Sequence, residues 1–276
     1  MAELPEIEIM RRDLDKDIGG RKIKTVEVLG PKRVVESAAT KKAFGTALEG
    51  RKLAAVQRRG LLLTFDVGDD ELLVADLGPN GRFRRAAARE EMGSDTQVVI
   101  TFTQGGQLRL IDGGQSAVLA IVPADEVAER YPTLGSLGFD PVDEPMSWTE
   151  FGQRLMREER TLRELLLDPG FVVGIGPVYC DEILHAALLR HDRPAHTLIT
   201  QEIRRLYRAI VETVHNAVKH RGVSFDDETD VFGEPGNYNE YLEVFGRAGE
   251  RSRNGRGDVL TMRLGGITHY FCDYQV

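Results

Sequence analysis

The chain has 276 residues, of which 41% are hydrophobic, and this length suits two compact units better than one. It contains no apolar run of about 18 residues and no charged-then-apolar leader, so we expect a cytoplasmic protein without a membrane-spanning helix. The formal net charge of −8 argues against strong non-specific affinity for DNA, and the acidity is uneven, because residues 1–135 carry −1 and residues 136–276 carry −7.

An amphipathic helix is predicted over residues 5–18, because apolar residues recur there at spacings of three and four. These apolar positions are Ile7, Met10, Leu14 and Ile18. From Lys22 to about Val122 the pattern changes to short, often alternating apolar runs that are separated by turn pairs such as Gly-Asp and Gly-Gly. This pattern predicts antiparallel β-structure, either a sandwich or a barrel.

The second half of the chain is predicted to be helical. Residues 132–147 are rich in proline and are expected to be a linker, and residues 148–222 show helical periodicity. Ser147 is expected to cap the first of these helices. The periodicity ends after Gly222, and residues 223–276 are expected to form loops and a short β-hairpin. The predicted organisation is therefore a β-domain over residues 1–131, the linker, a helical domain and the final segment. Cys180 and Cys272 are expected to be free thiols.

Four segments carry a resemblance to a known family. They are AELPEIE (2–8), LEGRKLAAVQRRGLLLTFDV (48–67), LLLDPGFVVGIGPVYCDEILHAALL (165–189) and GEPGNYNEYLEVFGRAGE (233–250). In this order they resemble the formamidopyrimidine-DNA glycosylase/endonuclease VIII family across nearly the whole chain. The resemblance implies an α+β fold: an N-terminal helix with an antiparallel β-sandwich domain, then a helix–two-turn–helix domain with a C-terminal β-hairpin finger.

The family's chemistry suggests a role for the first residues. It implies that a damaged base is flipped out of DNA, that the N-terminal amine attacks the sugar C1′ to form a Schiff base, and that strand cleavage follows. If Met1 is removed, Ala2 presents a primary amine where the family usually has proline, and Glu3 and Glu6 match carboxylates that transfer protons. A simpler interpretation is that these residues only begin a helix, with carboxylates near its positive end.

The resemblance also implies positions that bind DNA phosphates. Arg58 and Arg59 stand next to Leu61, which replaces the family's lysine. The turn at Gly174 and Gly176 precedes a helix whose N-terminal amides can approach a phosphate, although Pro177 replaces the family's asparagine. Two further candidates for DNA binding are Tyr179 in the same helix and Arg263 in the hairpin. For the arginines, a solvated position with no ligand is the alternative, and Tyr179 could serve only for packing.

Two loops lack the side chains that would fill the gap left by a flipped base. Pro79 stands for the family's intercalating methionine, and residues 113–116, Gly-Gly-Gln-Ser, replace its Arg-Phe wedge. Extrusion of a base costs a few kcal/mol, which inserted side chains help to offset. We therefore expect weak activity on 8-oxoguanine and better activity on abasic, single-stranded or already distorted DNA.

The final hairpin lacks the family's zinc ligands. A tetrahedral structural zinc needs four Cys or His ligands, but Ser252, Gly255 and Gln275 occupy three of the four positions and only Cys272 is kept. His269 adds one more potential ligand, which still does not make a structural site. We expect no metal and no cofactor, and a hairpin held by strand pairing and by the packing of its apolar side chains Leu260, Met262, Tyr270 and Phe271.

Three functions are compatible with these residues. The leading hypothesis is a monomeric DNA glycosylase and abasic-site lyase, weakened or altered in substrate, with DNA as its partner. The second is a paralogue that binds DNA without catalysis. The third is a scaffold that has been adapted to a protein partner, which the −7 balance of the second half motivates.

Overall fold

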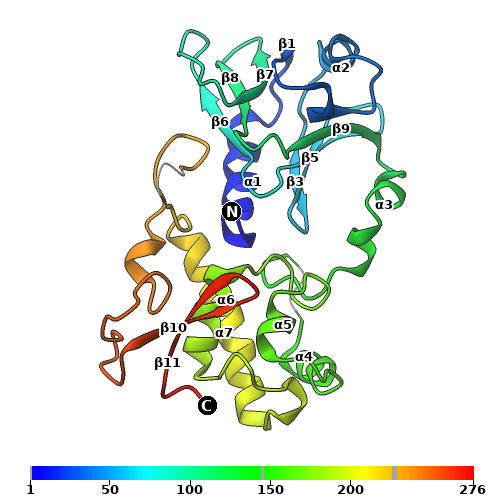
Figure 1. The fold of residues 1–276 in the computed structure, drawn as a ribbon. Helices are drawn as coiled ribbons and strands as arrows, with labels where there is room; N and C mark the ends of the chain where they lie inside the picture. Colours follow the sequence, from blue (N-terminus) through cyan, green and yellow to red (C-terminus); the bar gives the residue numbers. More distant parts are fainter. Residues whose placement is uncertain (1, 144–145, 226–228) are drawn as a thin grey trace. The chain divides into compact units, whose positions relative to one another are not determined.

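The chain folds into two compact units (Figure 1). The computed structural model describes residues 2–143, 146–225 and 229–276. Unit 1 consists of Met1–Ala2, Glu6–Gly135 and Ser224–Gly236, whereas unit 2 consists of Glu3–Pro5, Ser136–Val223 and Asn237–Val276. In the described residues, no helix has the length and apolar character that crossing a membrane requires.

Unit 1 begins with the predicted N-terminal helix and continues as two antiparallel sheets. Its elements, together with the short η2 that follows them, are α1 (Leu4–Ile18), β1 (Ile23–Val28), η1 (Lys32–Val34), β2 (Val35–Glu36), α2 (Lys41–Leu48), β3 (Val56–Arg59), β4 (Leu62–Asp66), β5 (Glu71–Asp76), β6 (Arg82–Ala86), β7 (Thr96–Phe102), β8 (Gln107–Ile111), β9 (Val118–Pro123), α3 (Val127–Arg130) and η2 (Pro132–Ser136). Thr40 caps α2 by accepting a hydrogen bond from the amide of Ala43. The sequence pattern did not predict α2, because its eight residues are too few to show a clear helical period.

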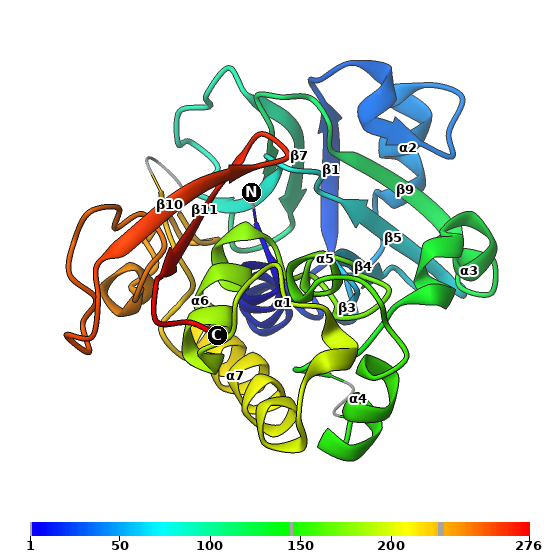
Figure 2. The ribbon, with the colours of Figure 1, turned by 60° about the horizontal axis from the view of Figure 1, so that its bottom comes forward.

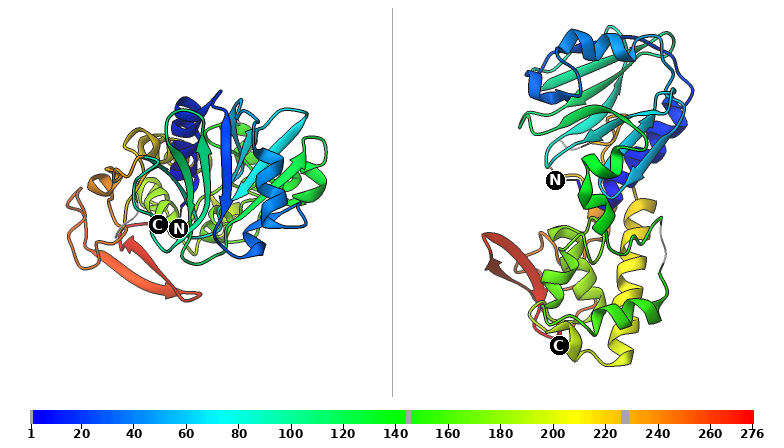
Figure 3. Two further views of the ribbon diagram at one scale, coloured as in Figure 1. Left: turned by 90° about the horizontal axis from the view of Figure 1, so that it is seen from above. Right: turned by 90° about the vertical axis from the view of Figure 1, so that its right-hand side faces the viewer.

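The strands of unit 1 form a sandwich. One sheet has the order β1-β7-β8-β6 and the other the order β2-β9-β5-β4-β3, and all pairs are antiparallel except β2 with β9. These strands, coloured blue to green, are drawn at the top of the right-hand view in Figure 3. Phe65 in one sheet meets Phe83 in the other edge to face, with ring centroids 5.5 Å apart. The apolar face of α1 is buried in the same core, so the predicted amphipathic helix is confirmed.

Unit 2 is helical except for one hairpin. Its elements are α4 (Trp148–Leu155), α5 (Leu162–Leu166), α6 (Pro177–Ala187), η3 (Ala195–Thr197), α7 (Thr200–Lys219), η4 (Tyr238–Tyr241), β10 (Val259–Leu264) and β11 (Ile267–Cys272). Ser147 caps α4 as predicted, and Thr161 with Glu164 forms a capping box on α5. The hairpin contacts α6 through β11 (Figure 2). The α+β fold with its helical second half agrees with the prediction.

Segments that were predicted to lie together are divided between the units. Residues 224–236 belong to unit 1, where the amide of Arg85 donates to the carbonyl of Val231, while the rest of the final segment belongs to unit 2. The expected linker contains the ordered turn η2, and unit 2 begins at Ser136. Both cysteines are free and buried, as expected.

Candidate functional site

The carboxylate of Glu3 binds the N-terminus of α6. It accepts hydrogen bonds from the amides of Gly176 at 2.7 Å, Val178 at 3.0 Å and Tyr179 at 3.3 Å, and only 3% of Glu3 is exposed. These amides are the donors that a helix leaves unsatisfied in its first turn, and the helix dipole favours a negative charge beside them. The first residues of the chain are thereby attached to unit 2 at a defined position.

Glycine is required where Glu3 approaches the turn. A Cβ atom on Gly176 would lie 2.5 Å from Cδ of Glu3, so a side chain there would displace the carboxylate. Gly174 has a φ of +63° and its carbonyl accepts the amide of Leu4 at 2.8 Å. The turn that was predicted to bind a phosphate therefore binds the protein's own N-terminal segment in this structure.

Tyr179 differs from the prediction in its accessibility. Its side chain is fully buried and packs against Tyr238, with ring centroids 5.9 Å apart, while its amide donates to Glu3. A side chain in this position supports the helix and offers no surface to a DNA backbone.

The other two candidate catalytic residues lie in the same segment. Ala2 is half-buried and packs against the apolar core of unit 1, and Glu6 is half-buried in the first turn of α1. Ala2, Glu3 and Glu6 therefore come together as neighbours along the chain.

Arg58 lies in a buried ion pair. Its guanidinium donates to Glu8 at 3.2 Å and to the carbonyl of Gly60 at 2.8 Å, and its side chain is fully buried. Burial on its own would raise the pKa of Glu8, but the hydrogen bonds and charges of Arg11, Arg12 and Arg58 outweigh it and hold this pKa below its usual value. Arg58 thus fixes α1 to β3, whereas its neighbour Arg59 is exposed and has no partner in the described part of the chain.

The two loops that lack wedge residues are tight, internally bonded turns. The buried carboxylate of Asp112 accepts the amides of Gly114 at 2.9 Å, Ser116 at 2.6 Å and Ala117 at 2.7 Å. In the other loop, the amide of Gly81 donates to the carbonyl of Leu77 at 2.9 Å. Each loop is ordered by its own hydrogen bonds.

The positions of the missing zinc ligands hold a hydrogen-bonded cluster. Asn254 and His185 both bond to the hydroxyl of Tyr274, at 2.7 and 2.6 Å. Gln275 accepts the amide of Cys272 at 2.7 Å and donates to the carbonyl of Leu189 at 2.8 Å. Among the described residues, no group of three potential ligands could hold a metal.

The hairpin is held differently from the prediction. Leu260, which was expected to pack, is 43% exposed, because β10 turns this face toward solvent. The small apolar cluster is formed instead by Val244, Val259 and Cys272, with Tyr270 and Tyr274 against it. Arg263 is exposed and donates to the carbonyl of Gly266 at 2.7 Å, across the hairpin turn.

Removal of metal is expected to leave the protein unchanged. Because the cluster around Tyr274 uses side-chain and backbone hydrogen bonds, a strong chelator should shift the Tm by less than about 1 °C, whereas folding that depends on a structural zinc fails without the metal. Differential scanning calorimetry with and without EDTA measures this, with metal content checked by mass spectrometry. A stoichiometric zinc that EDTA removes with loss of the hairpin would contradict it.

A second buried network ties the hairpin to the helices. Asp181 of α6 accepts from Arg163 of α5 at 2.7 Å, from Nδ1 of His269 at 2.5 Å and from the amide of Tyr270 at 2.8 Å. Asp181 and His269 are fully buried, and the ring of His191 packs against His269 at a tilt of 58°, with centroids 4.4 Å apart. Asp181 therefore joins three elements that are distant in the sequence.

Glu182, the next residue of α6, anchors the loop that precedes the hairpin. Its two carboxylate oxygens accept the amides of Glu243, Val244 and Phe245, each at 2.8–2.9 Å. Burial raises the pKa of Glu182 to about 7, although the three amide hydrogen bonds oppose this shift.

The stability of the fold is expected to decrease as pH rises, because of Glu182. Its pKa is higher in the folded than in the unfolded chain, so the folded state binds more protons, and the free energy of unfolding falls as pH rises from about 4.5 through about 7. The loss should be on the order of 2–3 kcal/mol. Urea unfolding of the wild type and of Glu182→Gln across this pH range measures the free energy of unfolding. The decrease with rising pH that Glu182 causes should be present in the wild type and absent from the variant. Parallel pH profiles for the two proteins would contradict the assignment.

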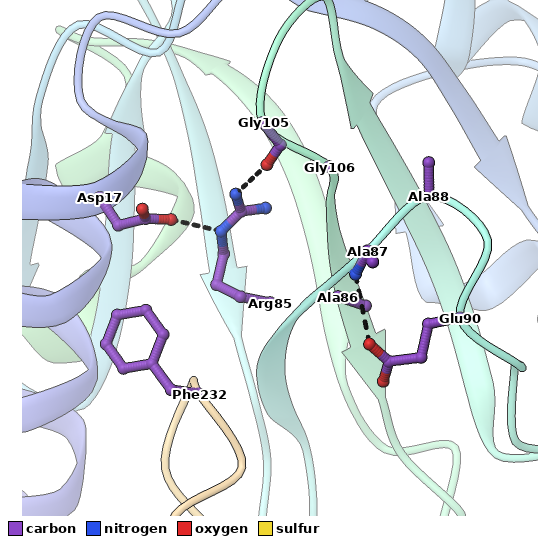
Figure 4. Close-up of a pocket in the computed structure, with 9 residues that line it drawn as sticks. All are labelled: Asp17, Arg85, Ala86, Ala87, Ala88, Glu90, Gly105, Gly106 and Phe232. Atoms are coloured by element: carbon purple, nitrogen blue, oxygen red, sulfur yellow. Dashed lines mark hydrogen bonds and ion pairs between the residues drawn. The ribbon is translucent and has the colours of Figure 1, made fainter.

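A shallow pocket in unit 1 is occupied by internal ion pairs (Figure 4). Arg85 points toward Asp17 and the carbonyl of Gly105 and bonds to both, and Glu90 accepts the amide of Ala87. The ring of Phe232 lies beside Arg85, on the same side as Asp17 (Figure 4). Because its cation, Arg85, is already paired with Asp17, this pocket of about 460 Å³ offers no unpaired charge for a substrate among the described residues that line it.

Sequence patterns did not point to several of these residues. Glu8, Asp181 and Glu182 are buried charges, and each has at least one partner 50 to 89 positions away, which no local period identifies. A charged residue at an apolar position of a predicted helix was the only signal available, and it applies to Glu8 in α1.

Comparison with known proteins gives consistent matches in both halves. The family model for the formamidopyrimidine-DNA glycosylase N-terminal domain matches residues 1–116, and the model for the formamidopyrimidine-DNA glycosylase H2TH domain matches residues 137–228. A formamidopyrimidine-DNA glycosylase from Heliobacterium modesticaldum is 36% identical over 275 residues, covering 99% of this chain and 98% of the relative. One from Pelotomaculum thermopropionicum is 33% identical over 272 residues, with the same coverage.

Solved structures agree with the sequence relatives. The chain resembles Lactococcus lactis Fpg in a complex with abasic-site DNA, with a TM-score of 0.89, 27% identity and 98% of each chain covered. A Lactococcus lactis Fpg mutant bound to DNA that contains Fapy-dG gives a TM-score of 0.88 at 26% identity, again with 98% of each chain covered.

Proposed function

The chain belongs to the formamidopyrimidine-DNA glycosylase family, and from that premise we propose that it is a DNA glycosylase and abasic-site lyase. The observation that carries this proposal is the whole-length likeness to an enzyme of this family solved on abasic-site DNA. DNA is accordingly the partner, and the reaction is removal of a damaged base followed by cleavage at the resulting abasic site.

The nucleophile that we propose is the amine of Ala2 after removal of Met1. An unperturbed α-amino group has a pKa of about 7.7–8.0, so a useful neutral fraction exists near pH 7. The amine forms a bond to C1′ of the sugar as the bond from C1′ to the base breaks, and the departing base takes a proton. Opening of the sugar ring gives an imine, and loss of a proton from C2′ then expels the 3′ phosphate.

Glu3 and Glu6 are given different roles. The carboxylate of Glu3 accepts three amides at the start of α6, so we assign it the positioning of Ala2. Glu6 is half-buried on the first turn of α1 and is the better candidate for proton transfer. Glu3 was expected from the sequence to transfer protons, and we propose instead that it positions Ala2.

The substrate that we propose is DNA whose base pairing is already weakened. The loops at residues 77–81 and 112–117 are bonded internally and bear no apolar wedge, so less help is available for extruding a stacked base. Exposed Arg59 and Arg263 remain available for phosphate contacts. No cofactor is needed for this chemistry, and the monomeric state and cytoplasmic location stay predictions.

The two alternatives are less well supported. A paralogue that only binds DNA and a scaffold for a protein partner both fit the replaced loop and finger residues. However, the relatives that match over 98% or more of this chain are glycosylases by name, and the N-terminal segment keeps its defined anchorage on α6. We therefore retain the enzyme as the proposal.

Borohydride trapping tests the proposed function. Protein whose intact mass confirms loss of Met1 is incubated with a duplex containing one abasic site and with sodium borohydride. Hydride reduces the imine at C1′ to a stable amine, so we expect a covalent protein–DNA complex of 1:1 mass. An undamaged duplex of the same sequence is the control. Absence of any adduct on abasic, bubble and single-stranded substrates would overturn the proposal.

A further inference from the structure

A cavity in unit 2 is not used by the proposed reaction. It has a volume of about 380 Å³ and lies between α6, α7 and the turn η4. Its lining residues are Glu182, Ala186, Ala209, Glu212, Thr213, Asn216, His220, Tyr238, Tyr241 and Glu243. This size is within the range of small-molecule and side-chain binding sites.

One wall of the cavity is aromatic. The rings of Tyr238 and Tyr241 are nearly parallel, with an angle of 19° and centroids 6.0 Å apart, and the ring of His220 packs against Tyr241 at a tilt of 35°, with centroids 3.9 Å apart. Tyr241 is 46% exposed, although an aromatic ring of this size usually contributes to a core. The wall therefore presents ring surface that is accessible from outside.

Carboxylates supply the charge of the cavity. Glu212 and Glu243 line it with carboxylates, and within the described part of the chain no lysine or arginine lines it. Glu182 also lines it, but its two oxygens already accept backbone amides of residues 243–245. Burial raises the pKa of the Tyr238 hydroxyl, and the charges of Glu182 and Glu243 raise it further. Glu212 pairs with Arg208 at 2.8 Å, but both side chains are largely exposed, and such surface pairs contribute little.

A polar group in the cavity is left without a partner. Tyr238 is 6% exposed, and its hydroxyl makes no hydrogen bond to any residue that the structure describes. A hydroxyl that lines an open cavity can bond to water or to a polar group of a ligand there. The aromatic wall, the carboxylates and this hydroxyl face the same space.

We propose that this cavity binds the alkylammonium group of a lysine side chain on a partner protein. A cation over aromatic faces is attracted by the ring quadrupoles, and neighbouring carboxylates strengthen the attraction. The same carboxylates repel phosphates and nucleotides, so the cavity is not a second DNA site. Its acidic character matches the −7 balance of residues 136–276, which points to basic partners for this half.

The experiment uses the full chain with ¹³C-labelled tyrosines and two peptides. The probe is Ac-Gly-Lys-Gly-NH₂, and the matched peptide carries norleucine, which has the same stem without the ammonium group. We expect the lysine peptide to shift the ring resonances of Tyr238 and Tyr241 in a saturable way and the norleucine peptide to leave them unchanged. Butylammonium, which carries the same charged group without a peptide backbone, should bind more weakly than the lysine peptide.

Variants at exposed positions test the assignment without disturbing the fold. Tyr241→Leu and Glu212→Gln should each raise the Kd for the lysine peptide by about threefold or more. Glu159→Gln, which removes one exposed charge of unit 2 outside the cavity, should leave the Kd within about 1.5-fold. Equal responses to the two peptides, or tighter binding of butylammonium, would overturn the proposal, as would an effect of Glu159→Gln as large as that of Glu212→Gln.

Discussion

The variant Ala2→Leu is expected to lose the borohydride adduct with abasic-site DNA by a factor of about 100 or more. A leucine at position 2 blocks removal of Met1, so the only α-amine is then that of Met1, one residue before position 2 and about 3.8 Å from the proper place. Misplacement of a reacting group by about 1 Å can already cost 10²-fold. The anchoring of Glu3 on α6 prevents the segment from shifting to compensate.

Small substitutions at the same position provide the matched control. Ala2→Gly and Ala2→Ser still allow loss of Met1 and keep a primary amine at position 2, so trapping should stay within about tenfold of wild type. Intact mass spectrometry verifies the N-terminus of each protein. Equal trapping by Ala2→Leu and wild type would show that another amine, such as a lysine, forms the imine. Loss of trapping in Ala2→Ser despite a correct N-terminus would also contradict the assignment.

The sequence predicted those parts of the fold that depend on local patterns. The period of Ile7, Met10 and Leu14 identified α1 and its buried face, and Ser147 identified the start of α4. Alternating runs identified the β-domain, but the pairing of β2 with β9 brings together residues more than 80 positions apart. Such pairing depends on packing of the whole sandwich, which no local period reveals.

The candidate site shows the same limit. Glu3 was identified by resemblance, yet its binding to amides 173 to 176 positions away gives it a positioning role that sequence spacing does not indicate. Arg58 was predicted to meet phosphate because it stands close to Leu61, which replaces the family's lysine. It is instead buried against Glu8, since α1 covers that strand with a carboxylate at the matching position. Long-range partners therefore decided which predicted residues stay accessible.

The largest expected loss of stability comes from Asp181→Ala. Asp181 accepts hydrogen bonds from Arg163, His269 and the amide of Tyr270, and the side chains of Asp181, Arg163 and His269 are buried. Removal of the carboxylate leaves the guanidinium of Arg163 buried without its counter-charge, which costs about 3–5 kcal/mol in comparable buried pairs. The hairpin should loosen first, because both His269 and Tyr270 belong to β11.

Urea unfolding at pH 7 measures this loss, and hydrogen exchange at the β11 amides locates it. Asp192→Ala is the matched control, because Asp192 pairs with Arg190 at 3.0 Å on the exposed surface and its loss should cost less than about 1 kcal/mol. Equal effects of the two substitutions would mean that the network around Asp181 contributes no more than a surface pair. The hairpin would then depend on its small apolar cluster alone, although Val244, Val259 and Cys272 bury too little surface to hold two strands against α6 without a polar anchor.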